Sequence, residues 1–366
     1  MILDRVNKLT SQGCRATIAG GAMVAGLVAF SSAAVAQKTS WNGGVTHVDT
    51  VAGPSLEGNL IGDPVFREAT VYLPPGYNRN RTKRYPVVYL LHGFAADHRA
   101  FMRGPYQNLN VRISMDSLIR AGRVKEMIVV TPNARNFFDG SFYTNSPVSG
   151  NWEDFIVRDL VSHMDRNYRT IRNRTARGIA GHSMGGYGTL RIGMRHPEVF
   201  SAIYALSPCC LAEMNRPERT AGWKAAIRTT ERSAYMKAGF NANLVYGIAT
   251  IYTPNPEKPP FFADLPYRLE GETLVSVPDV AAKWNASTPM AMVPSHLDAL
   301  RRLAIGFDAG DVDGLTDIPD NVRALDSLLT EAKVPHFAEI YPGNHGNRIR
   351  ARLETIVLPF FSRELH

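Results

Sequence analysis

The stretch RTARGIAGHSMGGYGTL, residues 174–190, decides the fold because it combines a strand, a sharp turn and the start of a helix. TARGIAG (175–181) is a short apolar run of the kind that forms a buried strand. Gly181 and Gly185 bracket Ser183, and both lack the side chain that would collide in a tight turn. This is the G-x-S-x-G pattern in a strand–turn–helix setting, which predicts that Ser183 is a nucleophile. An ordinary serine in a glycine-rich loop is the alternative.

Six further apolar runs alternate with segments of helical periodicity, which is typical of a mostly parallel sheet flanked by helices. The expected strands are 66–75, 85–93, 126–134, 200–208, 303–310 and 336–343, and the expected helices are 151–168, 321–333 and the last segment from 347. Residues 212–298 break the alternation with helical pieces and a proline-rich stretch. Together with the G-x-S-x-G turn, this pattern predicts an α/β-hydrolase domain over 37–366. Residues 212–298 are expected to form a helical or irregular, lid-like insertion before the predicted strand 303–310. A surface decoration without a function is the alternative for this insertion.

Residues 1–36 have the three parts of a secretory signal peptide. Three basic residues precede an uncharged apolar run of about 15 residues, and the small residues Ala34-Val35-Ala36 follow. A membrane anchor is the alternative, but the run is shorter than the ~20 residues that a membrane span needs. We therefore expect cleavage before Gln37, a secreted or periplasmic product and no stable membrane anchor after cleavage.

Charge and cysteine content argue against two classes of partner. The chain has a formal net charge of +8, and without residues 1–36 it keeps 38 basic and 32 acidic residues, a net charge of +6. The cluster RNRTKR (79–84) is typical of a solvated surface turn, so we expect no nucleic-acid partner. Cys209 and Cys210 are adjacent and lack the spacing of metal ligands. We expect them to be buried thiols, and we predict no metal site.

A nucleophilic serine needs a base that accepts its proton and an anion that orients the base. In α/β-hydrolases the acid and then the histidine follow the serine along the chain. His345 lies in the glycine-rich loop YPGNHGN (341–347), directly after a predicted strand, and is the expected base; a solvated loop histidine is the alternative. Asp313 is the expected acid, and Asp311 is the alternative. Whichever of the two is not the acid is expected to cap or shape the turn. His92 is expected to be structural.

Two backbone N–H groups are expected to stabilise the oxyanion of the tetrahedral intermediate. Met184 follows the nucleophile at the start of the predicted helix, and Phe94 follows the YLLHG strand, so these two residues are the expected donors. In SFYTN (141–145), Phe142 and Tyr143 are candidates for contacting an aromatic or sugar group of the substrate, with core packing as an equal alternative. This chemistry requires no metal or organic cofactor.

Several motifs resemble those of the Putative esterase family, a branch of the α/β-hydrolases that includes feruloyl and acetyl-xylan esterases, S-formylglutathione hydrolases and mycobacterial mycolyltransferases. They are VYLPPGY (71–77), YPVVYLLHGF (85–94), GNWEDFIVRDL (150–160), GHSMGGYGTL (181–190), GDVDGL (310–315) and YPGNHG (341–346). The resemblance covers roughly residues 55–210 and 300–360. It places the family's nucleophile, acid and histidine on Ser183, Asp313 and His345, and its oxyanion donors on Met184 and Phe94.

The resemblance implies a secreted serine carboxylic-ester hydrolase that acts through an acyl-enzyme on feruloyl, acetyl or similar esters, either as small molecules or linked to polysaccharides. Export disfavours hydrolysis of S-formylglutathione, which is expected where glutathione is present. An acyltransferase that moves the acyl group to a sugar or another alcohol is the first alternative, because it uses the same triad. A non-catalytic binding protein is the second, although no member of the triad is missing. Residues 212–298 match the family only loosely, so the substrate does not follow from the resemblance.

Overall fold

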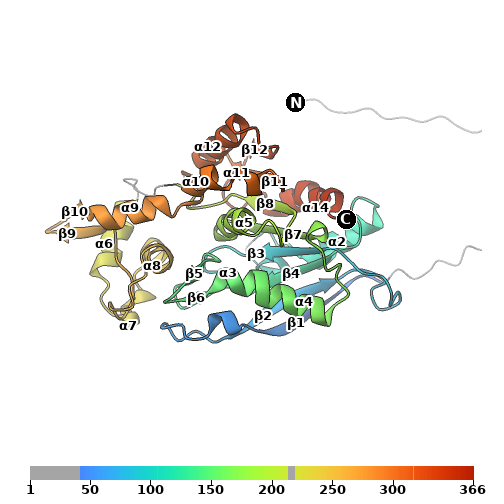
Figure 1. Ribbon diagram of the computed structural model, residues 1–366, viewed down its shortest axis with the longest axis horizontal. Helices are drawn as coiled ribbons and strands as arrows, with labels where there is room; N and C mark the ends of the chain where they lie inside the picture. The colour runs from blue at the N-terminus through green and yellow to red at the C-terminus, as the bar shows by residue number, and fades with distance from the viewer. Residues whose placement is uncertain (1–41, 105, 213–218, 316) are drawn as a thin grey trace, which may run out of the picture. The chain divides into compact units, whose positions relative to one another are not determined.

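Within residues 42–104, 106–212, 219–315 and 317–366, the computed structural model describes a central sheet of eight strands (Figure 1). Their order is β1-β2-β4-β3-β7-β8-β11-β12, and β2 is antiparallel to both β1 and β4 while the other neighbours are parallel. The strands are β1 (Val45–Ala52), β2 (Phe66–Leu73), β3 (Val87–Leu91), β4 (Ile128–Pro132), β7 (Arg177–His182), β8 (Ala202–Leu206), β11 (Ala304–Gly310) and β12 (Phe337–Tyr341). The mostly parallel sheet is therefore confirmed. The predicted signal peptide lies outside the described residues.

The central strands are buried on both faces, which explains their continuous apolar runs. In β3, Val87, Tyr89 and Leu91 belong to one hydrophobic core, and Val88 and Leu90 belong to the other. Successive side chains of a strand point to opposite faces, so a strand between two helical layers needs apolar residues at every position. All seven strands predicted from the sequence are present, and their observed ends lie within two residues of the predicted ends.

Helices cover both faces of the sheet, and their buried side chains complete the two cores. The first core includes side chains of α5 (Met184–Arg195), α12 (Asp317–Glu331) and the continuous run of α3 (Trp152–Asp154), a π-helical turn (Phe155–Leu160) and α4 (Val161–Asn167). The second includes side chains of α1 (Ala100–Arg103), α2 (Val111–Arg120) and the run of α13 (Ile349–Arg352), a π-helical turn (Leu353–Val357) and α14 (Leu358–Glu364). In the described part of the chain, no helix has the length and apolar character that crossing a membrane requires.

In its described residues, the insertion between β8 and β11 consists of helices and one small hairpin. They are α6 (Thr220–Arg228), α7 (Arg232–Tyr235), α8 (Phe240–Tyr252), the hairpin of β9 (Tyr267–Glu270) and β10 (Thr273–Ser276), α9 (Pro278–Ala286), α10 (Pro289–Met292) and α11 (Leu297–Leu300). In Figure 1 the yellow and orange elements from α6 to α9 gather on the left, beside the small hairpin of β5 (Asn145–Ser146) and β6 (Gly150–Asn151). The helical pieces agree with the sequence analysis, whereas the β9–β10 hairpin was not predicted.

Candidate active site

Ser183 lies on a sharp turn between β7 and α5. Its backbone has φ 57° and ψ −116°, a conformation that residues with a side chain rarely adopt. A Cβ on Gly181 would lie 2.8 Å from the Cα of Gly185, and one on Gly185 would lie 2.7 Å from the carbonyl carbon of Leu91. Both positions therefore require glycine, as predicted. The N–H of Ser183 donates to the carbonyl oxygen of Leu206 at 2.9 Å, which ties the turn to the end of β8.

The loops that follow β11 and β12 bring Asp313 and His345 together. Nδ1 of His345 and Oδ2 of Asp313 are 2.7 Å apart. The side chain of Asp313 is fully buried, and its Oδ1 accepts the N–H of Leu315 at 2.9 Å. Because Nδ1 faces a carboxylate, this nitrogen carries the proton of the neutral ring, and Nε2 is the basic nitrogen. The side chain of His345 is 29% exposed, so a substrate or water can approach it.

Asp311, the alternative acid, joins the two loops to each other. Its Oδ1 accepts the N–H of Gly343 at 2.9 Å, and its own N–H donates to the carbonyl oxygen of Tyr341 at 2.9 Å. A Cβ on Gly310 would lie 2.6 Å from the carbonyl carbon of Gly343, so the loops approach too closely for a side chain there. Asp311 therefore shapes the turn, whereas Asp313 is the aspartate that contacts His345.

The nucleophile turn and the His345 loop meet through His182, the residue before Ser183. Nε2 of His182 lies 2.7 Å from the carbonyl oxygen of His345, and the centroids of the two imidazole rings are 4.6 Å apart. Ser183 itself is only 7% exposed. The structure thus places the three predicted triad residues at the carboxyl ends of β7, β11 and β12, which is the edge of a parallel sheet where loops carry functional groups.

The side chains of Phe94 and Met184, the predicted oxyanion donors, meet at Gly140. A Cβ on Gly140 would lie 2.7 Å from Cδ2 of Phe94 and would overlap the sulfur of Met184, so both side chains close on Gly140. Met184 is the first residue of α5, and the first N–H groups of a helix have no acceptor within the helix. The same helix end favours negative charge.

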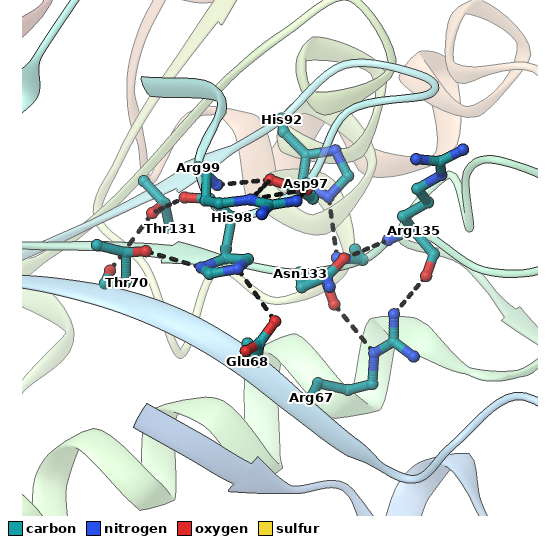
Figure 2. A network of polar contacts seen from close by, with 11 residues as sticks. Arg67, Glu68, Thr70, His92, Asp97, His98, Arg99, Thr131, Asn133 and Arg135 are labelled. Carbon is teal, nitrogen blue, oxygen red and sulfur yellow. Dashed lines mark hydrogen bonds and ion pairs between the residues drawn. The ribbon is translucent and has the colours of Figure 1, made fainter. Parts of the chain in front are cut away.

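A polar network holds the loop that carries Phe94 (Figure 2). Nδ1 of His98 lies 2.8 Å from Oγ1 of Thr70, and Nε2 of His98 lies 3.1 Å from Oε2 of Glu68. The carbonyl oxygen of His98 accepts the hydroxyl of Thr131 at 2.8 Å. The loop is therefore anchored to β2 through Glu68 and Thr70, and to β4 through Thr131.

His92 fixes the start of the same loop from a fully buried position. Its Nε2 accepts the N–H of Ala134 at 2.9 Å, so Nδ1 carries the proton and donates to the carbonyl oxygen of Gly93 at 2.8 Å. Burial lowers the pKa of His92 to about 4, which keeps the ring neutral near neutral pH. These contacts agree with the predicted structural role of His92.

Phe142 and Tyr143 are both fully buried. The hydroxyl of Tyr143 donates to the carbonyl oxygen of His92 at 2.9 Å. The ring of Phe142 packs against Phe94 and Tyr187, with centroid distances of 5.9 and 5.5 Å. Such contacts are those of core residues, and they favour core packing, the alternative left open above, over direct contact with a substrate.

Phe240, at the start of α8, is a residue that the sequence analysis missed. The residue is 51% exposed, and its ring meets Phe94 edge to face with centroids 5.5 Å apart. Further along α8, a Cβ on Gly247 would lie 3.1 Å from Cε2 of Phe94, so the helix packs directly on that ring. The insertion therefore contacts the loop of a predicted oxyanion donor. Residue type alone does not separate Phe240 from the many aromatic residues of the core.

Cys209 and Cys210 are free and buried, as predicted. The N–H of Cys209 donates to the carbonyl oxygen of Ser183 at 3.3 Å, so the pair packs behind the nucleophile turn. The contact with Cys209, together with burial, raises the pKa of the Cys210 thiol well above its usual value. A thiol in this environment stays protonated and unreactive.

The fold is that of the α/β-hydrolases, and solved structures share it. A ferulic acid esterase has a TM-score of 0.60 and 25% sequence identity, over 88% of this chain and 99% of that chain. A fluorophosphonate-binding serine hydrolase of Staphylococcus aureus has a TM-score of 0.56 and 17% identity, over 89% of this chain and 100% of that chain.

The sequence pattern of the Putative esterase family matches residues 66–350, and the chain belongs to this family. An endo-1,4-beta-xylanase/feruloyl esterase of Xylanibacter ruminicola is 34% identical over 140 residues, which are 37% of this chain and 18% of the relative. An esterase of Mycobacterium tuberculosis is 34% identical over 133 residues, 34% of this chain and 25% of that protein. The matches thus span a quarter or less of these curated relatives.

Proposed function

We propose that this chain hydrolyses carboxylic esters with Ser183 as the nucleophile, His345 as the base and Asp313 as the acid that orients the base. The observation that carries the proposal is the 2.7 Å contact between Nδ1 of His345 and Oδ2 of Asp313, next to a serine on a strained turn. A buried carboxylate bonded to a histidine and to one backbone N–H is the arrangement that holds an imidazole in one tautomer.

In the proposed reaction, Oγ of Ser183 attacks the ester carbonyl carbon while Nε2 of His345 accepts the hydroxyl proton. The N–H groups of Phe94 and Met184 donate to the oxyanion that forms, and each donor of this kind contributes roughly 3 kcal/mol to transition-state binding. The imidazolium gives its proton to the leaving alcohol, which leaves an acyl-enzyme. Water then attacks the acyl carbon, its proton passes to Nε2, and the serine hydroxyl is restored when the acid departs.

We infer that esters of aromatic acids are among the substrates, and that the 212–298 insertion forms a wall of the substrate site. Phe240 is half-exposed and its ring contacts Phe94, which offers an apolar, aromatic surface next to the proposed oxyanion hole. An aromatic pair contributes about 0.5–1.5 kcal/mol beyond the area that it buries. The relatives named feruloyl esterase and ferulic acid esterase support the same substrate class.

We also propose that residues 1–36 direct export and are removed before Gln37, so that the enzyme acts on polysaccharide-linked or environmental esters. The support is the order of basic, apolar and small residues in this segment. Mass spectrometry of the protein from the culture medium or periplasm tests the proposal. A mature chain that begins at Gln37 is expected, and an exported chain that retains residues 1–36 would contradict it.

A substrate panel tests the activity itself. Wild type is expected to hydrolyse p-nitrophenyl acetate, methyl ferulate and acetylated xylan to different extents, and Ser183→Ala is expected to hydrolyse none of them. Ser201→Ala, a change at the opposite end of β8, is the control that should retain activity. Equal hydrolysis by Ser183→Ala and wild type would refute the nucleophile. Product analysis with added glucose or trehalose distinguishes hydrolysis from acyl transfer.

A further inference from the structure

His182 forms a hydrogen bond at each ring nitrogen, and the two bonds lead to different parts of the proposed active site. Nε2 lies 2.7 Å from the carbonyl oxygen of His345, and Nδ1 lies 3.1 Å from the hydroxyl oxygen of Tyr106. The Tyr106 oxygen in turn accepts the N–H of Gly93 at 3.4 Å. One chain of polar contacts therefore joins the loop after β3, the nucleophile turn and the loop after β12.

The chemistry of the partners sets the direction of each bond in this chain. A carbonyl oxygen only accepts, so Nε2 of His182 must carry a proton toward His345. In the neutral ring Nδ1 is then an acceptor, and the hydroxyl of Tyr106 donates to it. The same tyrosine oxygen keeps lone pairs for the N–H of Gly93. Every member of the chain is satisfied with His182 neutral.

The surroundings keep both side chains neutral. Burial, followed by the neighbouring His345, lowers the pKa of His182 well below its usual value. Burial raises the pKa of Tyr106 to about 12. Fully satisfied, buried polar networks hold their groups in one arrangement, because a broken bond leaves an unsatisfied polar group inside the protein.

We propose that His182 is a positioning residue for the hydrolase. Its hydrogen bonds fix the positions of the His345 loop and the Phe94 loop relative to Ser183. The inference rests on the proposed function. Its basis is that Gly93 precedes Phe94, His182 precedes Ser183, and the bond to the His345 loop is made by the backbone of the base itself. Displacement of reacting groups by about 1 Å can reduce a rate by about 10²-fold.

Three variants separate positioning from general stability. His182→Leu removes both hydrogen bonds and keeps an apolar side chain in the buried site, and we expect kcat to fall by about 10²-fold with KM unchanged. His182→Gln keeps a donor and an acceptor, and we expect it to recover most of that loss. Tyr106→Phe removes the hydroxyl and its contacts with His182 and Gly93 but leaves the bond from His182 to the His345 loop, so we expect a smaller fall in kcat, of about tenfold.

His196→Leu is the matched control. His196 caps the C-terminal end of α5, where its Nε2 lies 2.8 Å from Oε1 of Glu153, so the change removes a histidine contact at the far end of the same helix. We expect lower stability and an unchanged kcat for this variant. Thermal melts recorded for all variants identify those that are folded.

The outcomes that would overturn the inference are an unchanged kcat in folded His182→Leu, or a His182→Gln variant that is no more active than His182→Leu. Should His182→Leu not fold, an unchanged kcat in Tyr106→Phe is sufficient to overturn the inference, and the proposed function is not affected by that result. Wild-type hydrolysis that is absent, or that persists in Ser183→Ala, refutes the proposed function instead and removes the basis of the inference with it.

Discussion

The nucleophile turn and the insertion differ in what constrains their residues. In the turn, neighbouring backbone fixes the glycines, and a Cβ on Gly186 would also lie 2.9 Å from the Cα of Pro208. In the insertion, Gly239 and Gly271 have positive φ values, 92° and 59°, and an added Cβ would meet no atom within 4 Å. The turn therefore depends on close packing from several strands, whereas Gly239 and Gly271 serve only local turns of the insertion.

This difference separates the proposed chemistry from the proposed specificity. Proton transfer needs groups held within a fraction of an ångström, and Ser183, Asp313 and His345 all follow strands of the packed sheet. Substrate selection needs surface that can vary, and Phe240 lies on a helix of the insertion and is half-exposed. Changes in the first region should affect every substrate, and changes in the second should affect some substrates more than others.

The largest effect is expected for His345→Ala. Loss of the base should reduce kcat for every ester by about 10⁶-fold, because triad residues act as a unit. Steady-state kinetics with p-nitrophenyl acetate and methyl ferulate measure this loss, with His336→Ala as a control histidine on the same segment. A variant that keeps a tenth of wild-type kcat would contradict the role of His345.

Asp313→Asn should follow, with kcat lower by about 10⁴-fold because the amide no longer fixes the tautomer of His345. Asp311→Asn is the matched variant, since an asparagine oxygen can still accept the N–H of Gly343, and we expect a loss of less than about tenfold. Kinetics at constant pH compare the two. Equal losses would mean that the two aspartates do not divide the roles as proposed.

Gly185→Ala and Gly271→Ala compare the two regions directly. The first places a methyl group against the backbone of Leu91 and should destabilise the fold by several kcal/mol, about 3 or more, as overpacking and backbone displacement combine. The second should cost about 1–2 kcal/mol, the effect of a left-handed residue with a side chain. Chemical denaturation gives both values, and a Gly271→Ala variant that is the less stable of the two would contradict the comparison.

Acidification should destabilise the fold through His92. Its folded pKa of about 4 lies below the ordinary value of 6.5, so between these values the unfolded chain binds more protons. The contribution of His92 is complete above pH 6.5 and is lost as the pH falls toward 4, by about 3 kcal/mol. Denaturation across this window should show a shallower pH dependence for His92→Gln than for wild type. The exposed His47→Gln variant should keep the wild-type slope, and identical slopes for all three proteins would exclude this contribution.

The smallest effect is expected for Phe240→Ala. Loss of one aromatic contact should reduce kcat/KM for methyl ferulate about five- to tenfold and leave p-nitrophenyl acetate nearly unchanged. Met236→Ala, an exposed change just before the same helix, is the control. A parallel loss on both esters would place Phe240 outside the acyl-group contact.

The sequence predicted the elements whose residues are constrained locally. The G-x-S-x-G turn, the buried strands and the order of the candidate triad residues depend on short motifs and on periodicity. Strand ends were less accurate: Tyr85, expected inside a strand, forms only an isolated bridge to Thr170, and β3 begins at Val87. β1 was missed because it is an edge strand, and most of its residues are exposed and carry no apolar pattern.

Contacts between distant segments could not be predicted from one sequence. His182 and His345 are 163 positions apart, and no local pattern links an imidazole to that particular carbonyl group. Phe240 meets Phe94 only because α8 packs on the loop after β3. Phe142 and Tyr143 were ambiguous for the same reason, since a loop position does not reveal whether a ring faces the core.

Labelling with an alkyl fluorophosphonate, followed by mass spectrometry of the digested protein, tests the central claim most directly. This reagent reacts with a serine that a neighbouring base has activated. We predict one adduct, on Ser183, which forms in wild type and is lost in His345→Ala. An adduct on another residue, or full ester hydrolysis without any adduct, would contradict the account.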